Sequence, residues 1–195
     1  MSDELPLNTI IFDWDLTLWN SWDSHLAAVT HVNKMLDLPT TPRNVIIETY
    51  SIPFDNHLKN LFPLRTKTAI KRYYDFYSAN VYELAHLYEG VKEALTIFKN
   101  HGYRLALLSD KHVSFGQPEL IQSGLDVFLD FAAFRTDHTT FKPDPQRLLD
   151  ILIPLGAHKN QTLYVGDSPV DIQCAFNAGV RGAAALWSAL DQEAT

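Results

Sequence analysis

A short apolar run that ends in two carboxylates constrains this chain more than any other feature. Residues 8–12 are mostly β-branched or apolar and follow closely after a proline, which is typical of a buried strand. Asp13 and Asp15 come next, and strand alternation predicts that they share one side of the backbone while Trp14 faces away. Paired acids at a buried strand end are costly unless a divalent cation or a catalytic role compensates them. A solvated turn would explain this pair taken alone, so its meaning depends on the rest of the chain.

The composition is that of one globular domain, or of a domain with a modest insertion. The chain has 195 residues, of which 46% are hydrophobic, so it can bury a sizeable core. The net charge of -7 argues against a nucleic-acid-binding protein, which would show a basic face. No secretory signal and no membrane-spanning stretch is evident, so we expect a cytoplasmic protein without a membrane partner. The single cysteine, Cys174, excludes an internal disulfide and is expected to pack against a helix.

Between residues 20 and 87 the apolar spacing is helical. Helices are predicted from Ser21 or Asp23 to Leu36, from Pro42 to about Tyr50, and over residues 66–86. A proline-broken segment, residues 52–57, separates the second helix from the third, and no strand pattern is visible. The sequence therefore predicts a helical block that stands between two strands.

From residue 88 onward, strand and helix patterns alternate. The predicted strands cover residues 103–108, 128–134, 163–165 and 182–186. The predicted helices cover residues 91–101, 118–123, 145–155 and 172–178. This alternation predicts an α/β fold, a Rossmann-like parallel sheet with helices on both faces.

Polar groups with useful chemistry follow the predicted strands, where sheets of this kind bind ligands. They are Asp13 with Asp15, Ser109, Lys142, and Asp167 with Asp171. The carboxylates could supply hard oxygen ligands for Mg²⁺, and Lys142 could hold a phosphate or a carboxylate nucleophile. Each group alone has an ordinary surface or capping explanation, but their order along the chain favours one site.

These motifs resemble those of the haloacid-dehalogenase-like hydrolase superfamily, in particular its phosphoglycolate-phosphatase-like branch. The first family motif, Asp-x-Asp-x-Thr, matches residues 13–17, and the second matches Ser109. The third, a lysine before a proline, matches Lys142, and the fourth, Gly-Asp-x-x-x-Asp, matches residues 166–171. The resemblance covers nearly the whole chain. It implies a catalytic α/β core of residues 1–19 and 88–195 and an α-helical cap of residues 20–87.

The resemblance also implies a role for each matching residue. Asp13 resembles the nucleophile that forms an aspartyl-phosphate, and Asp15 the general acid and base, whose backbone carbonyl also binds Mg²⁺. Thr17 resembles the residue that stabilises the loop, while Ser109 and Lys142 resemble phosphate binders, Lys142 also pairing with the nucleophile. Asp167 resembles the direct metal ligand and Asp171 its support. The implied enzyme is a Mg²⁺-dependent phosphatase of small phosphorylated molecules.

Two residues depart from the family pattern. Leu16 stands where the branch usually has glycine, so the turn of that loop is expected to differ. Asp110 follows Ser109 where asparagine or glycine is common. An acid there would repel a phosphate unless its side chain turns away and only its N–H group takes part in substrate binding.

Other functions stay open on the sequence alone. A phosphomutase or phosphotransferase would need the same residues. A dehalogenase would need neither Mg²⁺ nor an acidic residue at position 15, so the presence of Asp15 argues against it. A phosphonate hydrolase would need a cap lysine in a dry pocket, and a catalytically silent binding protein would not need this charge cluster. The lysines available in the helical block are Lys59, Lys67 and Lys71.

The helical block is expected to set substrate specificity. Five of its cationic or titratable side chains are candidates to meet an anionic substrate, although a surface role is the simpler explanation for each: His25, His57, Arg65, Lys67 and Arg72. Aromatic residues nearby could line an apolar wall, with core packing as the simpler explanation: Trp19, Trp22, Tyr50 and Phe54.

Overall fold

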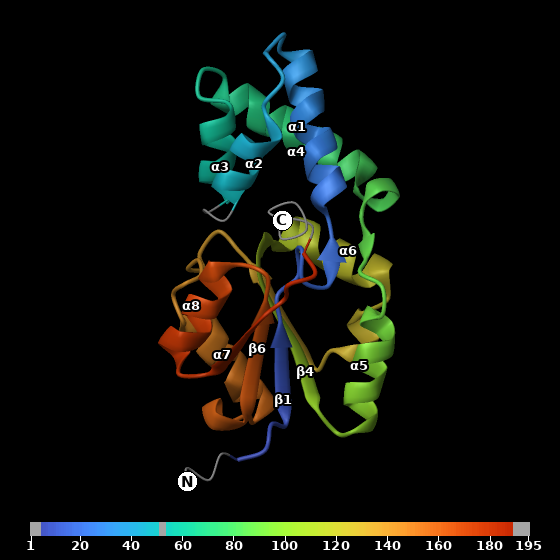
Figure 1. Ribbon diagram of the computed structural model, residues 1–195, viewed down its shortest axis with the longest axis vertical. Helices are drawn as coiled ribbons and strands as arrows, with labels where there is room; N and C mark the ends of the chain where they lie inside the picture. Colours follow the sequence, from blue (N-terminus) through green and yellow to red (C-terminus); the bar gives the residue numbers. More distant parts are fainter. Residues whose placement is uncertain (1–4, 51–53, 189–195) are drawn as a thin grey trace. The chain divides into compact units, whose positions relative to one another are not determined.

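The computed structural model describes residues 5–50 and 54–188 of the chain (Figure 1). The chain divides into two compact units. The first comprises Met1–Asn20 and Leu87–Thr195, and the second comprises Ser21–His86. Among the described helices, none combines the length and the apolar character that crossing a membrane requires.

The first unit is built on a five-stranded parallel sheet. Its strand order is β5-β4-β1-β6-β7, so β1 lies in the centre. The strands are β1 (Thr9–Phe12), β4 (Arg104–His112), β5 (Phe131–Arg135), β6 (Thr162–Gly166) and β7 (Arg181–Ala184). All four residues of β1 are buried, as a central strand covered on both faces requires.

Helices cover both faces of this sheet. They are α5 (Val91–Asn100), α6 (Val113–Ser123), α7 (Gln146–Leu155) and α8 (Pro169–Ala178), with short 3-10 helices at Asp126–Phe128 and Lys159–Gln161. Figure 1 shows α7 and α8 on one side of the sheet and α5 on the other. A hydrophobic core joins β1, β4 and β6 to α7 and α8, and Cys174 is one of its buried members. The predicted α/β fold and the packed position of Cys174 are confirmed.

The described part of the second unit contains four helices. They are α1 (Trp22–Met35), α2 (Arg43–Tyr50), α3 (Phe54–Leu61) and α4 (Thr66–Leu84). The two long helices α1 and α4 pack against each other, and α3 contacts both α2 and α4. The predicted helical insertion after β1 is therefore present, with its first helix starting just after Ser21 as expected.

Three local predictions for the segment from residue 20 to 87 need correction. The proline-broken segment was not expected to be helical, but α3 begins at Phe54; Ile52 and Pro53 lie outside the described residues. Two strands also occur where none was expected, β2 (Trp19–Asn20) and β3 (His86–Leu87), which pair as a separate two-stranded sheet. A strand of two residues is too short to leave an alternating pattern in the sequence. Because β3 takes His86, α4 ends two residues earlier than predicted.

In the first unit, the boundaries of several elements differ from the prediction; α8, for example, begins at Pro169 rather than at residue 172. Helix α6 begins at Val113 and carries Pro118 in its interior, whereas a proline is usually expected in the first turn. Strand β4 extends through Ser109 to His112, and β5 begins only at Phe131. Strand β7 covers Arg181–Ala184 rather than residues 182–186.

Candidate active site

The strand register brings the predicted site residues to one edge of the sheet. Phe12, the last residue of β1, is level with Leu107 in β4 and with Val165 in β6. The Asp13 N–H group then donates to the Val165 carbonyl at 2.8 Å, which continues this pairing by one residue. Asp13 therefore leaves the sheet between the ends of its two neighbouring strands, where side chains from all three can meet.

Lys142 connects two of the aspartates. Its Nζ atom lies 2.7 Å from Asp13 Oδ1 and 2.5 Å from Asp171 Oδ1. It also donates to the Tyr164 hydroxyl at 3.2 Å. Burial alone would lower the pKa of Lys142, but the carboxylates of Asp13 and Asp171 hold it well above its usual range. Lys142 is therefore a fixed positive charge against Asp13.

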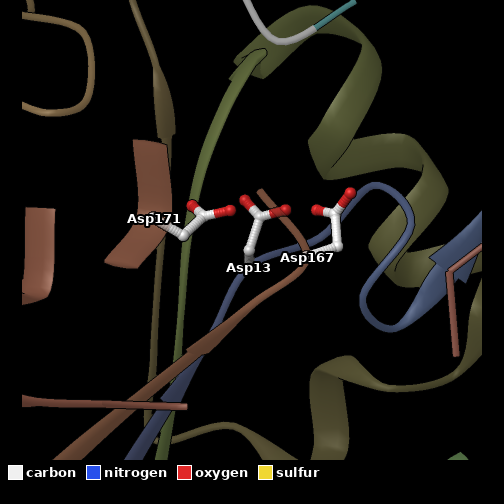
Figure 2. A group of neighbouring side chains, drawn as sticks. All are labelled: Asp13, Asp167 and Asp171. Carbon is white, nitrogen blue, oxygen red and sulfur yellow. The ribbon is translucent and has the colours of Figure 1, made fainter. Parts of the chain in front are cut away.

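Asp13, Asp167 and Asp171 form a cluster that fits a divalent cation. One carboxylate oxygen from each lies within 4.8 Å of the others. Figure 2 shows the three carboxylates side by side, with that of Asp13 in the middle. Burial raises the pKa of Asp13, an effect that Lys142 opposes and Asp171 reinforces. Burial and the Asp171 charge raise the pKa of Asp167 to about 7. Hard oxygen ligands crowded against one another in this way are suited to Mg²⁺, because its charge would compensate theirs.

Asp171 is already engaged through both of its oxygens. Besides Lys142, its Oδ1 accepts from the Tyr164 hydroxyl at 2.9 Å. Its Oδ2 accepts from the Ser168 hydroxyl at 2.6 Å and from the Ser168 N–H at 3.1 Å, which closes a capping box at the start of α8. Burial would raise the pKa of Asp171, but Lys142 and the Ser168 bonds keep it below its ordinary value. This geometry suits a residue that supports a metal site more than a direct ligand.

The loop after β1 is held by its own backbone. Leu16 N–H donates to the Trp19 carbonyl at 2.8 Å, and Leu18 and Trp19 both donate to the Trp14 carbonyl at 3.0 Å. Leu16 is fully buried and has φ of +60°, so a non-glycine residue adopts the left-handed conformation here. The backbone of this turn is thus the one that glycine would favour, although the side chain is leucine. Thr17 is also buried, and its hydroxyl is 3.5 Å from Asp167 Oδ1.

Ser109 and Asp110 lie in β4, at an irregularity of its pairing with β5 between Leu108 and His112. The Ser109 hydroxyl is buried and accepts from the Lys111 N–H at 3.1 Å. The Asp110 carboxylate accepts from Arg147 Nη1 at 2.6 Å and from the Lys142 N–H at 3.1 Å. Its charge is therefore compensated by Arg147, which removes the objection that an acid at this position would repel a phosphate.

Asp15 forms an ion pair with a different lysine from the one that contacts Asp13. Its Oδ1 lies 2.9 Å from Lys111 Nζ, and the same Nζ lies 2.6 Å from Glu119 Oε2. Asp15 also contributes to the raised pKa of Asp167, so the two carboxylates face the same region. The two acids of the first motif thus have separate cationic partners.

The candidates for specificity in the second unit divide into two groups. His25 and His57 are buried, and their Nε2 atoms are 3.1 Å apart. Both imidazoles also contact a hydroxyl group, His25 that of Tyr73 and His57 that of Thr49, so their ring nitrogens are engaged inside that unit. The three cationic candidates and the lysines available to a phosphonate hydrolase have exposed side chains: Arg65, Lys67, Arg72, Lys59 and Lys71. None of the five offers the dry setting that a reactive lysine needs.

Several residues of the site were not predicted. Tyr164, Arg147 and Ser168 support the aspartates and Lys142, while Lys111 and Glu119 support Asp15. Ser168 could have been found, because serine before Pro169 is a helix-start signal. Lys111 stands two residues after Ser109, outside the four motifs. Arg147 and Glu119 lie within helices, where their sequence context gives no sign that they turn inward.

Comparison with known proteins identifies the family. The sequence matches the family described as haloacid dehalogenase-like hydrolase over residues 10–185. The chain belongs to this family and is a hydrolase of its kind, as the motifs predicted.

Its relatives include phosphatases of two kinds. The pyrophosphatase PpaX of Halalkalibacterium halodurans is 31% identical, over 92% of this chain and 83% of that protein. The phosphoglycolate phosphatase of Pasteurella multocida is 29% identical, over 86% of this chain and 80% of that protein. A crystal structure from Haemophilus somnus, described as a predicted phosphoglycolate phosphatase, superposes with a TM-score of 0.86. It is 25% identical and covers 93% of this chain and 86% of its own.

Proposed function

We propose that this protein is a Mg²⁺-dependent phosphatase that acts on small phosphorylated molecules through an aspartyl-phosphate on Asp13. The observation that carries the proposal is the contact of Lys142 Nζ with Asp13 Oδ1 at 2.7 Å, within a cluster that includes Asp167 and Asp171. A nucleophilic carboxylate needs a nearby cation, both to stay ionised and to tolerate an anionic phosphate. The similarity to pyrophosphatases and phosphoglycolate phosphatases supports the same class of reaction.

In the proposed reaction, an Asp13 oxygen forms a bond to phosphorus while the bond from phosphorus to the leaving oxygen breaks. Asp15 gives its proton to that oxygen. Water then attacks the phosphorus of the aspartyl-phosphate as Asp15 takes one proton from it. The Asp13–phosphorus bond breaks, which releases phosphate and restores the carboxylate.

The remaining residues bind and orient. Lys142 and the Ser109 hydroxyl would donate to phosphate oxygens, with the Asp110 N–H as a further donor. Thr17 would keep the loop in place. Asp167, an Asp13 oxygen and the Asp15 carbonyl would hold Mg²⁺, with Asp171 in support. Bound Mg²⁺ supplies positive charge that lets an anionic carboxylate approach a phosphate.

Two features of the substrate follow from the relatives. Pyrophosphate and phosphoglycolate are both small, and each carries a second anionic group beyond the phosphoryl group that is transferred. We infer that the substrate is a small phosphate ester or anhydride of this kind. Residues 20–87 would act as the family's cap and select it. A cytoplasmic location is expected for such an enzyme.

Phosphate release from a panel of small phosphate esters and pyrophosphate tests the proposal. We expect turnover with Mg²⁺ and none with a chelator. Asp13→Asn should lower kcat by on the order of 10³-fold or more, because the amide is a poor nucleophile. The matched control is Asp150→Asn, since Asp150 is exposed on α7 and its hydrogen bond from Gln146 survives the change.

Other outcomes would point to the alternatives. Isomerised sugar phosphates without free phosphate would indicate a phosphomutase. Full activity in Asp13→Asn would exclude the aspartyl-phosphate route. No turnover of any substrate, with Mg²⁺ binding intact, would favour a binding protein.

A further inference from the structure

A second buried ion cluster lies beside Asp15. Lys111, near the end of β4, places its Nζ 2.9 Å from Asp15 Oδ1 and 2.6 Å from Glu119 Oε2. Glu119 is on α6, and its Oε2 also accepts from the Trp14 indole N–H at 2.9 Å. The side chains of Lys111 and Glu119 are 10% and 1% exposed. The cluster therefore joins the catalytic loop, the neighbouring strand and a helix.

The loop is held on both sides of its backbone. Trp14 stands between the two acids of the first motif, is fully buried, and is bound to Glu119. Asp15, the next residue, reaches Lys111, which is bound to the same Glu119. Two consecutive side chains of the loop are thus connected to the Glu119 carboxylate: Trp14 binds it directly, and Asp15 is linked to it through Lys111. The Lys111 N–H donates to the Ser109 hydroxyl, which ties the cluster to the proposed phosphate site.

Stability alone does not explain these charges. Removing the charges of a lysine and a glutamate from water is costly, and an apolar pair of similar size is often at least as stable. Burial raises the pKa of Glu119, although Lys111 opposes the effect. Lys111 is thus held between two carboxylates, and its short contact with Asp15 Oδ1 restrains the Asp15 side chain.

We propose that Lys111, anchored by Glu119, is a positioning residue that holds the Asp15 carboxyl group where it can protonate the leaving oxygen. This inference rests on the proposed phosphatase function. General acid catalysis requires the acid to stay within hydrogen-bond reach of the leaving atom. A short aspartate side chain on a loop meets that condition only if its rotamer is fixed, and a lysine held by a second carboxylate fixes it.

The test compares two substrates that differ in their need for an acid. An alkyl phosphate needs a proton on its leaving oxygen, whereas the nitrophenolate of p-nitrophenyl phosphate leaves without one. The measured quantity is kcat/KM, because it covers the steps up to departure of the leaving group and excludes the later hydrolysis of the aspartyl-phosphate. Lys111→Met should lower kcat/KM for the alkyl phosphate at least about tenfold more than for p-nitrophenyl phosphate.

A second variant guards against loss of folding. Glu119→Gln keeps the side-chain volume and an oxygen acceptor for Trp14 and Lys111, so it should fold. It should show the same substrate pattern with a smaller difference. Asp15→Asn removes the acid itself and so gives the largest difference in kcat/KM between the two substrates. Lys99→Met, which breaks an ion pair with Asp130 elsewhere in the first unit, is the matched control. It should leave kcat/KM unchanged for both substrates.

Equal losses for both substrates in Lys111→Met and Glu119→Gln would overturn the inference, because a merely structural role does not distinguish leaving groups. That result would leave the proposed function intact, since the wild type would still be active. A wild-type enzyme that hydrolyses neither substrate with Mg²⁺ would instead overturn the proposed function, and the positioning role with it.

Discussion

At the scale of single residues, Leu16 combines two opposed requirements. Its side chain is fully buried, yet its φ of +60° lies in the region that glycine favours. Leucine in this conformation costs roughly 1–2 kcal/mol relative to glycine, whereas a buried leucine side chain contributes more than that. The burial of the side chain therefore explains why leucine is tolerated where the family commonly has glycine.

This balance predicts an unusual order of stabilities. In the interior of a helix or strand, glycine makes a protein less stable than alanine does by roughly 0.5–1 kcal/mol. At Leu16 the relief of the left-handed conformation should offset that difference, so Leu16→Gly should cost no more than Leu16→Ala. Both should lower the free energy of unfolding by about 2–5 kcal/mol, measured by urea denaturation.

Leu107 is the matched control for this comparison. It is equally buried, but it lies in the extended strand β4. There, Leu107→Gly should be less stable than Leu107→Ala by about 1 kcal/mol. If the Gly–Ala order were the same at both positions, the conformational explanation for Leu16 would be wrong.

At the scale of elements, a buried polar chain links the four helices of the second unit. Thr49 on α2 is 2.8 Å from His57 Nδ1 on α3, and His57 Nε2 is 3.1 Å from His25 Nε2 on α1. His25 Nδ1 is in turn 2.8 Å from the Tyr73 hydroxyl on α4. Aromatic rings such as Tyr50 surround both imidazoles. The histidines considered for substrate binding are thus structural parts of this unit.

This buried network should make the stability of the second unit sensitive to acid. Burial lowers the pKa of His57 to about 4, below the unfolded value of 6.5, so the unfolded state takes up the proton first as pH falls. The contribution of His57 to stability is therefore complete above pH 6.5 and is lost between pH 6.5 and 4. The loss should approach about 3 kcal/mol, because each pKa unit corresponds to about 1.4 kcal/mol.

Urea denaturation of the full chain at several pH values measures this effect. Trp22, whose ring centroid is 5.6 Å from that of His25, offers a fluorescence signal from the same unit. His57→Gln should be less stable at pH 7 but should lose much less stability on acidification than the wild type. His101→Gln, at an exposed position in the first unit, controls for the loss of an imidazole. Equal slopes in wild type and His57→Gln would refute the prediction.

The elements that could be predicted are those in which a periodic or continuous apolar pattern extends over several residues. Helix α4 repeats its apolar positions over about five turns, and β1 is a fully buried run of β-branched and aromatic residues, so both were predicted. Helix α3 was hidden by the proline before it, and β2 and β3 are too short to show alternation. The boundaries of α6 were missed because Pro118, a common first-turn residue, lies in its interior.

The candidate site shows the same division. Asp13 and Asp167 were predicted because each belongs to a motif directly after a strand, and Lys142 because it precedes a proline in the loop after β5; the structure brings the three together. Glu119 and Arg147 could not be predicted, because their importance comes from partners far along the chain. Glu119 meets Trp14, 105 residues away, and Arg147 meets the Ser109 carbonyl, 38 residues away. Periodicity does not report such contacts.

At the scale of the whole molecule, the charge opposes the proposed substrate. The net charge is -7, and around Asp13 the carboxylates outnumber the lysines. Without a cation, the site should therefore repel a phosphate, even though Lys142 and Ser109 can donate to it. Binding of Mg²⁺ and binding of phosphate should then be strongly coupled, each favouring the other by the same factor.

Thermal unfolding with and without inorganic phosphate, the expected product, tests this coupling. Phosphate alone should leave Tm unchanged, because a ligand that does not bind the folded state cannot stabilise it. With Mg²⁺ present, phosphate should raise Tm beyond the effect of Mg²⁺ alone, and its affinity should increase at least about tenfold, a coupling of about 1.4 kcal/mol. Sodium chloride at matched ionic strength controls for screening, and Asp167→Asn should abolish the added stabilisation by weakening the metal site. If phosphate stabilised the protein equally with and without Mg²⁺, the lysines alone would overcome the negative charge, and the metal would be needed only for the chemical step.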